Sequence, residues 1–153
     1  AAAACATAAE GNIYLIGGMW DATLAAVQEY DPETGSWTPR ADMPTARRDL
    51  SCVTVGGLIY ALGGINSEGV AVATVEVYDP RADRWWSVAD MPVERWLFAT
   101  VALGPKIYAI GGKPLHGRKA KLDRVDVYDT GATNLTVSSH GKLTTTWGAM
   151  KHR

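Results

Sequence analysis

Residues 13–18 read IYLIGG, and the phrase returns as IYALGG at residues 59–64 and as IYAIGG at residues 107–112. A run of β-branched, apolar and aromatic residues closed by two glycines is typical of a strand that ends in a turn. Self-similarity at a period of about 20–50 residues marks an architecture of stacked repeats. The chain is therefore predicted to contain three copies of one structural unit.

Aromatic residues repeat together with this phrase. The repeated aromatics are Tyr30, Tyr78 and Tyr128, each followed by aspartate, and Trp37 and Trp85. A residue that the unit itself needs should recur at the same place in each copy, whereas a residue that serves a partner has no reason to recur. We therefore expect these aromatics to pack within the repeat, with their polar atoms hydrogen-bonded.

The middle copy has the clearest pattern of secondary structure. Residues 50–55, 58–62, 74–78 and 84–88 are short apolar or alternating segments, and each predicts a strand. The two glycines at positions 56 and 57 predict a tight hairpin between the first two strands. No helical period interrupts the pattern, so the unit is predicted to be a four-stranded antiparallel sheet.

The same pattern divides the whole chain into three units, residues 1–45, 46–93 and 94–153. The third unit departs from the others because a polar, Ser/Thr/Gly-rich insert at residues 130–146 delays its last aromatic to Trp147. We expect the insert to be a long loop, and the pattern does not predict the register of the last strand.

Three co-registered copies of a strand, Gly-Gly, Tyr and Trp resemble the kelch repeat of β-propellers. The resemblance covers essentially the whole chain and implies an all-β fold of kelch-type blades, each a four-stranded antiparallel sheet around a central channel. Closed propellers have about four to eight blades. Three blades therefore imply a half propeller or fragment: either part of a longer chain, or an arc that closes with another copy as a homodimer. The two possibilities are compatible.

Composition excludes several classes of protein. The 153 residues are 47% apolar and 20% charged with a net charge of -1, which is typical of a globular domain and gives no field to attract nucleic acid or an acidic membrane. Residues 1–9 lack the basic region of a secretory signal. Cys5 and Cys52 lie in predicted strands and are expected to be buried free thiols, which favours a reducing compartment and a cytoplasmic location.

Arg47 and Arg95 recur just after the two Met-Pro sequences. One role for them is structural, as an ion pair or a clamp on backbone carbonyls between blades. The second role follows from the resemblance, because the linkers between kelch blades, and the loops that join the second and third strands, often line the partner-binding face. Both roles stay open at this point.

Unrepeated residues on the same linkers and loops are the sharper candidates for binding. Trp20 follows the first Gly-Gly, and residues 113–121 form a strongly basic loop, for which a solvated turn without a partner is the alternative. Exposed aromatics with arginines are typical of protein-binding hot spots. The predicted partner-binding residues are Trp20, Arg47, Arg48, Asn66, Ser67, Arg95, Trp96, His116, Arg118 and Lys119.

The sequence does not predict catalysis. One oxidase class with the kelch fold uses a copper site of Tyr, Cys and His, but the three histidines here are all in the third copy and show no ligand spacing. We therefore expect no metal, no cofactor and no enzyme activity. The predicted function is a non-catalytic module that binds a protein or peptide, by resemblance a substrate adaptor or cytoskeletal scaffold. The alternatives are a fragment of a kelch-type enzyme acting on a small molecule, and a bare scaffold that self-associates.

Overall fold

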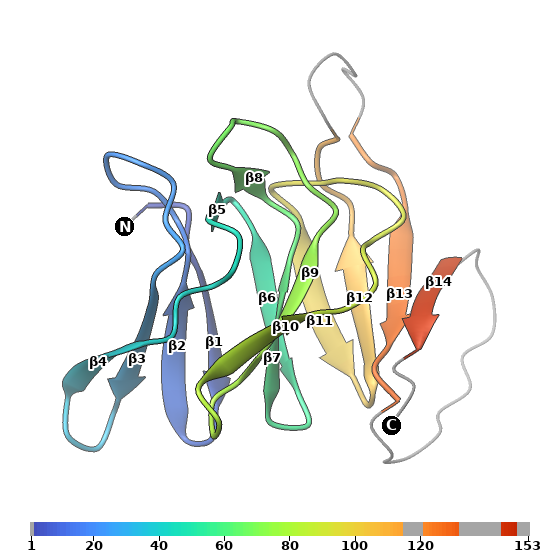
Figure 1. The fold of residues 1–153 in the computed structure, drawn as a ribbon. Helices are drawn as coiled ribbons and strands as arrows, with labels where there is room; N and C mark the ends of the chain where they lie inside the picture. The colour runs from blue at the N-terminus through green and yellow to red at the C-terminus, as the bar shows by residue number, and fades with distance from the viewer. Residues whose placement is uncertain (1, 115–120, 132–144, 150–153) are drawn as a thin grey trace.

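A computed structural model describes residues 2–114, 121–131 and 145–149, the last of these as backbone only. The described residues form three four-stranded sheets and one two-stranded ribbon, and the sheets stand side by side in chain order (Figure 1). The first sheet contains β1 (Cys5–Ala9), β2 (Asn12–Ile16), β3 (Val27–Asp31) and β4 (Ser36–Arg40).

The second sheet repeats this order with β6 (Ser51–Val55), β7 (Leu58–Leu62), β9 (Val75–Asp79) and β10 (Arg84–Ser87). The third contains β11 (Ala99–Leu103), β12 (Lys106–Ile110), β13 (Val125–Asp129) and β14 (Thr145–Ala149). The ribbon pairs β5 (Arg47–Arg48) with β8 (Ile65–Asn66). The predicted all-β fold of three repeated sheets is confirmed.

The outermost strand of the third sheet differs from the prediction. All other neighbours within the three sheets are antiparallel, but β14 pairs in parallel with β13, and the register shifts between Val127 and Asp129. Turns join β3 to β4 and β9 to β10, so those strands must return antiparallel. A parallel return needs a connection of about a dozen residues or more, and only the third unit has such a segment, between Asp129 and Thr145. Residues 132–144 of the predicted insert lie outside the described residues.

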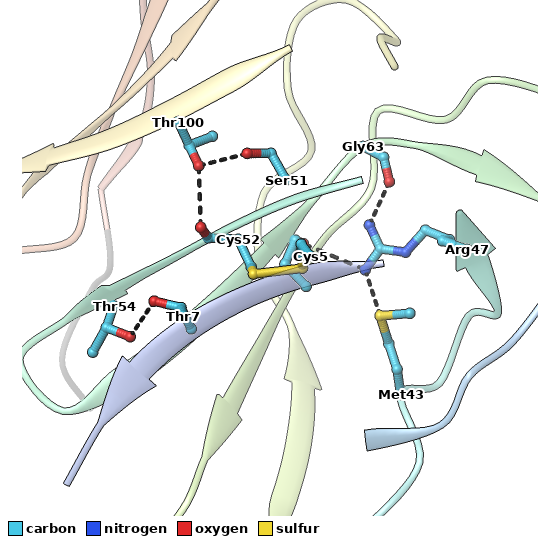
Figure 2. Close-up of a disulfide and its surroundings, with 10 residues drawn as sticks. Cys5, Thr7, Met43, Arg47, Ser51, Cys52, Thr54, Gly63 and Thr100 are labelled. Atoms are coloured by element: carbon cyan, nitrogen blue, oxygen red, sulfur yellow. Dashed lines mark hydrogen bonds between the residues drawn. A yellow bond between two sulfur atoms is a disulfide. The ribbon is translucent and has the colours of Figure 1, made fainter. Parts of the chain in front are cut away.

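The innermost strands β1, β6 and β11 lie next to one another, and two hydroxyl pairs join them. Thr7 hydrogen-bonds Thr54 at 3.0 Å between the first and second sheets, and Ser51 hydrogen-bonds Thr100 at 2.8 Å between the second and third (Figure 2). Two apolar cores fill the space between the sheets. The first includes Tyr14, Ile16, Ile59 and Tyr78, and the second includes Tyr60, Leu62, Val77, Ile107 and Tyr128.

The cysteines correct one prediction. Cys5 and Cys52 are not free thiols but form a disulfide that joins β1 to β6 across the first junction between sheets, with their Cα atoms 5.8 Å apart (Figure 2). The two residues are 47 positions apart and belong to different repeats. Strand pairing within each repeat therefore gave no indication of their contact.

One buried arginine fixes the linker before the second sheet to that sheet, and another does the same for the third sheet. Arg47 donates hydrogen bonds to the carbonyl oxygens of Gly63 and Thr74 at 2.9 and 3.1 Å, and to the Glu76 carboxylate at 2.8 Å. Arg95 repeats the arrangement in the third sheet, with the carbonyl oxygens of Ala109 and Gly111 and the Asp126 carboxylate. A single side chain thus satisfies several backbone acceptors and neutralises a buried acid.

Arg47→Met tests this role. The substitution is expected to lower the free energy of unfolding by about 3–5 kcal/mol, because it leaves the Glu76 carboxylate buried without its partner. Urea denaturation measures the change. Arg48→Met is the matched control and should cost no more than about 1 kcal/mol, since Arg48 pairs with Asp49 near the surface. Equal losses in the two variants would contradict the structural role of Arg47.

The disulfide gives a second prediction. The double variant Cys5→Ser, Cys52→Thr places at the first junction the hydroxyl pair that Ser51 and Thr100 form at the second. It should fold, with a free energy of unfolding about 2–4 kcal/mol below that of the oxidised protein, because the covalent link restrains the unfolded chain. Thermal melts with and without dithiothreitol are the measurement. The reductant should destabilise the wild type and leave the variant unchanged; a wild type with two alkylatable thiols would refute the disulfide.

Candidate partner-binding surface

Three short backbone pairs line the end of the sheets at which the second strand passes to the third. In each pair, a linker residue exchanges backbone contacts with the residue that follows Gly-Gly, and we call these the rim pairs. Ala2 and Met19 exchange hydrogen bonds of 2.9 and 2.7 Å, and Trp96 and Lys113 exchange bonds of 3.1 and 2.9 Å. The rim pairs are Ala2 with Met19, Arg48 with Ile65, and Trp96 with Lys113.

The repeated glycines allow the linkers to approach. A Cβ atom on Gly63 would lie 2.5 Å from the carbonyl oxygen of Arg95, on the linker to the third sheet. A Cβ atom on Gly64 would lie 2.6 Å from the carbonyl oxygen of Arg48, on the linker of its own sheet. Gly64 also donates its N–H to the Arg95 carbonyl at 2.8 Å. The Gly-Gly pairs of the first two sheets are therefore packed between two linkers and serve backbone geometry.

A second repeated feature runs across the sheets just before their innermost strands. Ala3, Asp49 and Leu97 all have positive φ, at 57°, 53° and 50°. The Asp49 N–H donates to the Ala3 carbonyl at 2.8 Å, and the Leu97 N–H donates to the Asp49 carbonyl at 3.2 Å. We call this chain of bonds the rim ladder. It places the three linkers, and hence Arg48 and Trp96, on one continuous edge.

Trp20 is the most exposed aromatic residue on this edge. Its side chain is 74% exposed, and the neighbouring Met19 is 38% exposed. The Trp20 N–H donates to the Ala22 carbonyl at 3.1 Å, which keeps the loop tight. A large apolar side chain that is exposed to water on a tight loop is available to enter a pocket on another molecule.

Arg48 and Trp96 occupy equivalent positions in successive rim pairs and are both half-buried. The Arg48 guanidinium donates to the Asp49 carboxylate at 2.7 Å. The ammonium nitrogen of Lys113 lies 5.2 Å from the centre of the Trp96 ring, which is within cation–π range. On this edge, the Arg48 side chain is paired with Asp49, and the Trp96 ring is covered by the Lys113 ammonium group.

The loop of the second sheet is polar. Asn66 accepts hydrogen bonds from the N–H groups of Glu68 and Val70 at 3.1 and 2.9 Å through its side-chain oxygen. Asn66 therefore builds its own turn and keeps only its amide nitrogen for another contact. Ser67 is exposed at the tip of the loop.

Arg47 and Arg95 do not belong to this surface. Both side chains are fully buried, so they have no atoms available to a partner in this arrangement. Burial lowers the pKa of the Arg47 guanidinium, while the charge and hydrogen bond of Glu76 act in the opposite direction. Of the two roles left open by the sequence, the carbonyl clamp with an ion pair is the one the geometry shows, and it acts between a linker and its own sheet.

Three other predicted residues, His116, Arg118 and Lys119, lie outside the described residues. One exposed residue was missed by sequence reasoning. Leu97 is 54% exposed at the end of the rim ladder, next to Trp96. The signal in the sequence was its position: Leu97 is equivalent to Ala3 and Asp49, and a large apolar side chain occurs there only in the third unit.

Titration behaviour does not point to a reaction centre. Burial, with hydrogen bonds to Glu29 and Asp83, raises the pKa values of Tyr14 and Tyr78, and both rings lie in the core between the first two sheets. The Tyr78 hydroxyl and the Ala41 N–H both donate to Asp83, which lowers the pKa of that carboxyl. These shifts accompany packing. Among the described residues, no group of three or more His, Cys, Asp or Glu side chains is placed to hold a metal ion.

Twisted four-stranded sheets, stacked side by side through their innermost strands, define the chain as an arc of β-propeller blades. The family model of the kelch motif matches residues 1–44 and 46–92. The chain belongs to the kelch family.

Curated relatives match over short segments. Kelch-like protein 24 of Rattus norvegicus is 51% identical over 39 residues, which is 26% of this chain and 6% of that protein. Kelch-like ECH-associated protein 1B of Danio rerio is 34% identical over 55 residues, 36% of this chain and 9% of that protein. Alpha-scruin of Limulus polyphemus is 39% identical over 57 residues, 36% of this chain and 6% of that protein. The chain thus spans less than a tenth of the length of these relatives.

A solved structure, titled "Structure of YjhT", matches the fold with a TM-score of 0.75 and 19% sequence identity. The match covers 83% of this chain and 48% of that chain. At this identity the match supports the fold alone. The three sheets described here are thus a propeller fragment, equivalent to about half of the solved chain.

Proposed function

We propose that this chain is a non-catalytic interaction module that binds a protein or peptide through the edge formed by the rim pairs. The observation that carries the proposal is the 74% exposure of Trp20 on a tight loop. Protein-binding hot spots are enriched in tryptophan and arginine, and the same edge holds Arg48 and Trp96. Leu97 adds apolar surface beside them.

The relatives support a role in recognition. Kelch-like ECH-associated protein 1B is named for an association with ECH. Substrate adaptor and cytoskeletal scaffold are the two forms of recognition that the resemblance implies for this chain. We propose no nucleic-acid and no membrane partner, since the net charge is -1. None of the described segments is a helix of the length and apolarity needed to cross a membrane.

Two further expectations stay predictions. A cytoplasmic location was favoured by free thiols, and the Cys5–Cys52 disulfide removes that support. The absence of enzyme activity also stays a prediction, with a fragment of a kelch-type enzyme as its alternative. Metal analysis of the purified protein separates the two, because a stoichiometric transition metal would favour the enzyme.

Trp20→Ala tests the binding surface. Peptides selected from a random display library on the wild-type chain provide the probe, and calorimetry gives their dissociation constants. We expect Trp20→Ala to weaken binding by about tenfold or more, because a buried aromatic anchor contributes about 2 kcal/mol or more at a hot spot. The melting temperature should not change, since the side chain is mostly in water.

Arg81→Ala is the matched control. Arg81 is exposed in the turn between β9 and β10, at the opposite end of the sheets, where it pairs with Glu10. Its substitution should leave peptide affinity unchanged. Selected peptides that bind Trp20→Ala, Arg48→Ala and Trp96→Ala as tightly as the wild type would place recognition elsewhere and overturn the proposal.

We also propose that the arc self-associates, as a homodimer. The faces of the first and third sheets that point away from the second carry exposed apolar side chains, including Ile13, Val101 and Leu103. Light scattering is expected to give the mass of two chains at micromolar concentration, because burying these faces removes apolar surface from water. A monodisperse monomer that binds no apolar dye would contradict self-association and would leave the peptide-binding proposal untouched.

A further inference from the structure

The outer face of the third sheet repeats residues that are buried at the internal junctions. Ile16 of the first sheet and Leu62 of the second are both 0% exposed, because each packs against the next sheet. Ile110 occupies the equivalent place at the end of β12 and is 42% exposed. Leu103, the equivalent of the buried Val55, is 64% exposed. The third sheet therefore presents the same kind of face as the first two, without a sheet to cover it.

The outer face of the first sheet is the complementary case. Ile59 and Ile107 each pack against the preceding sheet and are 0% exposed. Ile13 is their equivalent in β2 and is 41% exposed. The exposed face of the first sheet is thus the kind that packs against a preceding sheet. The exposed face of the third sheet is the kind that packs against a following sheet.

The backbone at the rim also has two open ends. In the described part of the chain, the Ala3 N–H has no backbone acceptor and the Leu97 carbonyl has no backbone donor, although both lie in the rim ladder. The glycines of the third sheet also lack the contacts that a following linker makes in the first two sheets. Gly18 and Gly64 donate their N–H groups to the linker that leads to the next sheet, but Gly112 has no such acceptor among the described residues. A Cβ atom on Gly111 would meet its nearest atom only at 3.5 Å, so the place of a next linker is open.

One pair of facing residues differs in chemistry between the two internal junctions, and its equivalents on the outer sheets can be used to test how two copies pack. The first residue of an innermost strand faces the second residue of the next innermost strand. At the first junction this position holds the disulfide of Cys5 and Cys52, and at the second it holds the hydrogen bond of Ser51 and Thr100. Ala99 and Ala6 are the equivalents on the third and first sheets, and both are exposed.

We propose that the third sheet of one copy packs against the first sheet of a second copy in the register of the internal junctions. In this register, the Leu97 carbonyl accepts from the Ala3 N–H of the second copy, and Ala99 lies opposite Ala6. The proposal rests on the self-association proposed above and specifies how it occurs.

A second copy is the occupant because one chain carries both halves of the junction. The rim ladder is directional, with a free donor on the first sheet and a free acceptor on the third, so copies join head to tail. Head-to-tail contacts between identical chains close into a ring when the rotation allows. Each arc supplies three four-stranded sheets, so two copies supply six, which lies within the range of about four to eight blades of a closed propeller, and the two contacts between the copies are identical.

Disulfide trapping tests the register. Ala6→Cys and Ala99→Cys are introduced together into the Cys5→Ser, Cys52→Thr variant, so that the new cysteines are alone. Mild oxidation is expected to convert most of the protein into a covalent dimer on a non-reducing gel, since the native pair shows that this position admits a disulfide.

The matched control pairs Ala99→Cys with Ala8→Cys in the same background. Ala8 is exposed on the same face of β1, two residues from Ala6, and therefore about 6.6 Å further along the strand. Covalent dimer should form at least about tenfold more slowly than with Ala6→Cys, because the sulfur atoms are out of reach in the proposed register. Equal rates for the two pairs would overturn the proposal.

A second measurement avoids the cysteine background. Ile110→Asp in the wild-type chain places a charge on a side chain that is 42% exposed in the isolated arc, so the arc should fold. Its mass by light scattering should fall from two chains to one. A dimer that survives Ile110→Asp and resists trapping refutes the proposed register while self-association stands. A wild-type monomer refutes self-association itself, and the register with it.

Discussion

The buried arginine between each linker and its sheet is the interaction on which the arc depends. Arg47 and Arg95 reach into the second and third sheets from 16 residues before the first glycine of Gly-Gly, and each neutralises one buried carboxylate. The same offset in the first unit gives Ala1, and Gln28 stands where Glu76 would be. Cation and acid are absent together, as expected if either one alone would be a costly buried charge. The positions of the two linkers that carry Arg48 and Trp96 follow from these pairs.

Much of the fold was predictable because the repeat supplies three versions of each signal. Strand positions, the Gly-Gly turns and the packing tyrosines follow from hydrophobic period and recurrence. The parallel pairing of β14 was not predictable, since it depends on a long connection that occurs only in the third unit. Nor was the Cys5–Cys52 link, because its partners lie in different repeats and meet only when the sheets stack. Comparing the phases of neighbouring repeats would have brought these two positions together.

The candidate surface was predictable in part, because most residues that recur in the repeats serve the fold, whereas residues that do not recur can serve a partner. Trp20 does not recur and is exposed, whereas Arg47 and Arg95 recur and are buried. For these three residues, recurrence separated the binding candidate from the framework residues, and the position of the linkers in related propellers misdirected the choice of the two arginines. Recurrence failed for Trp37, which recurs as Trp85 and stacks on Tyr30 but is 55% exposed. Leu97 escaped notice because its neighbours are polar or aromatic. Its exposure becomes evident only when the rim ladder shows where the linker turns.

The unlike chemistry at one junction position has a mechanical consequence. A covalent bond joins the first two sheets, and a hydroxyl pair at the same place joins the second to the third. A covalent bond does not yield at forces that separate hydrogen-bonded and apolar contacts. Tension applied along the arc would therefore detach the third sheet first and leave the first two together. The junction between the second and third sheets is therefore the mechanically weaker of the two, because Ser51 and Thr100 meet there through oxygen atoms, whereas Cys5 and Cys52 meet through sulfur.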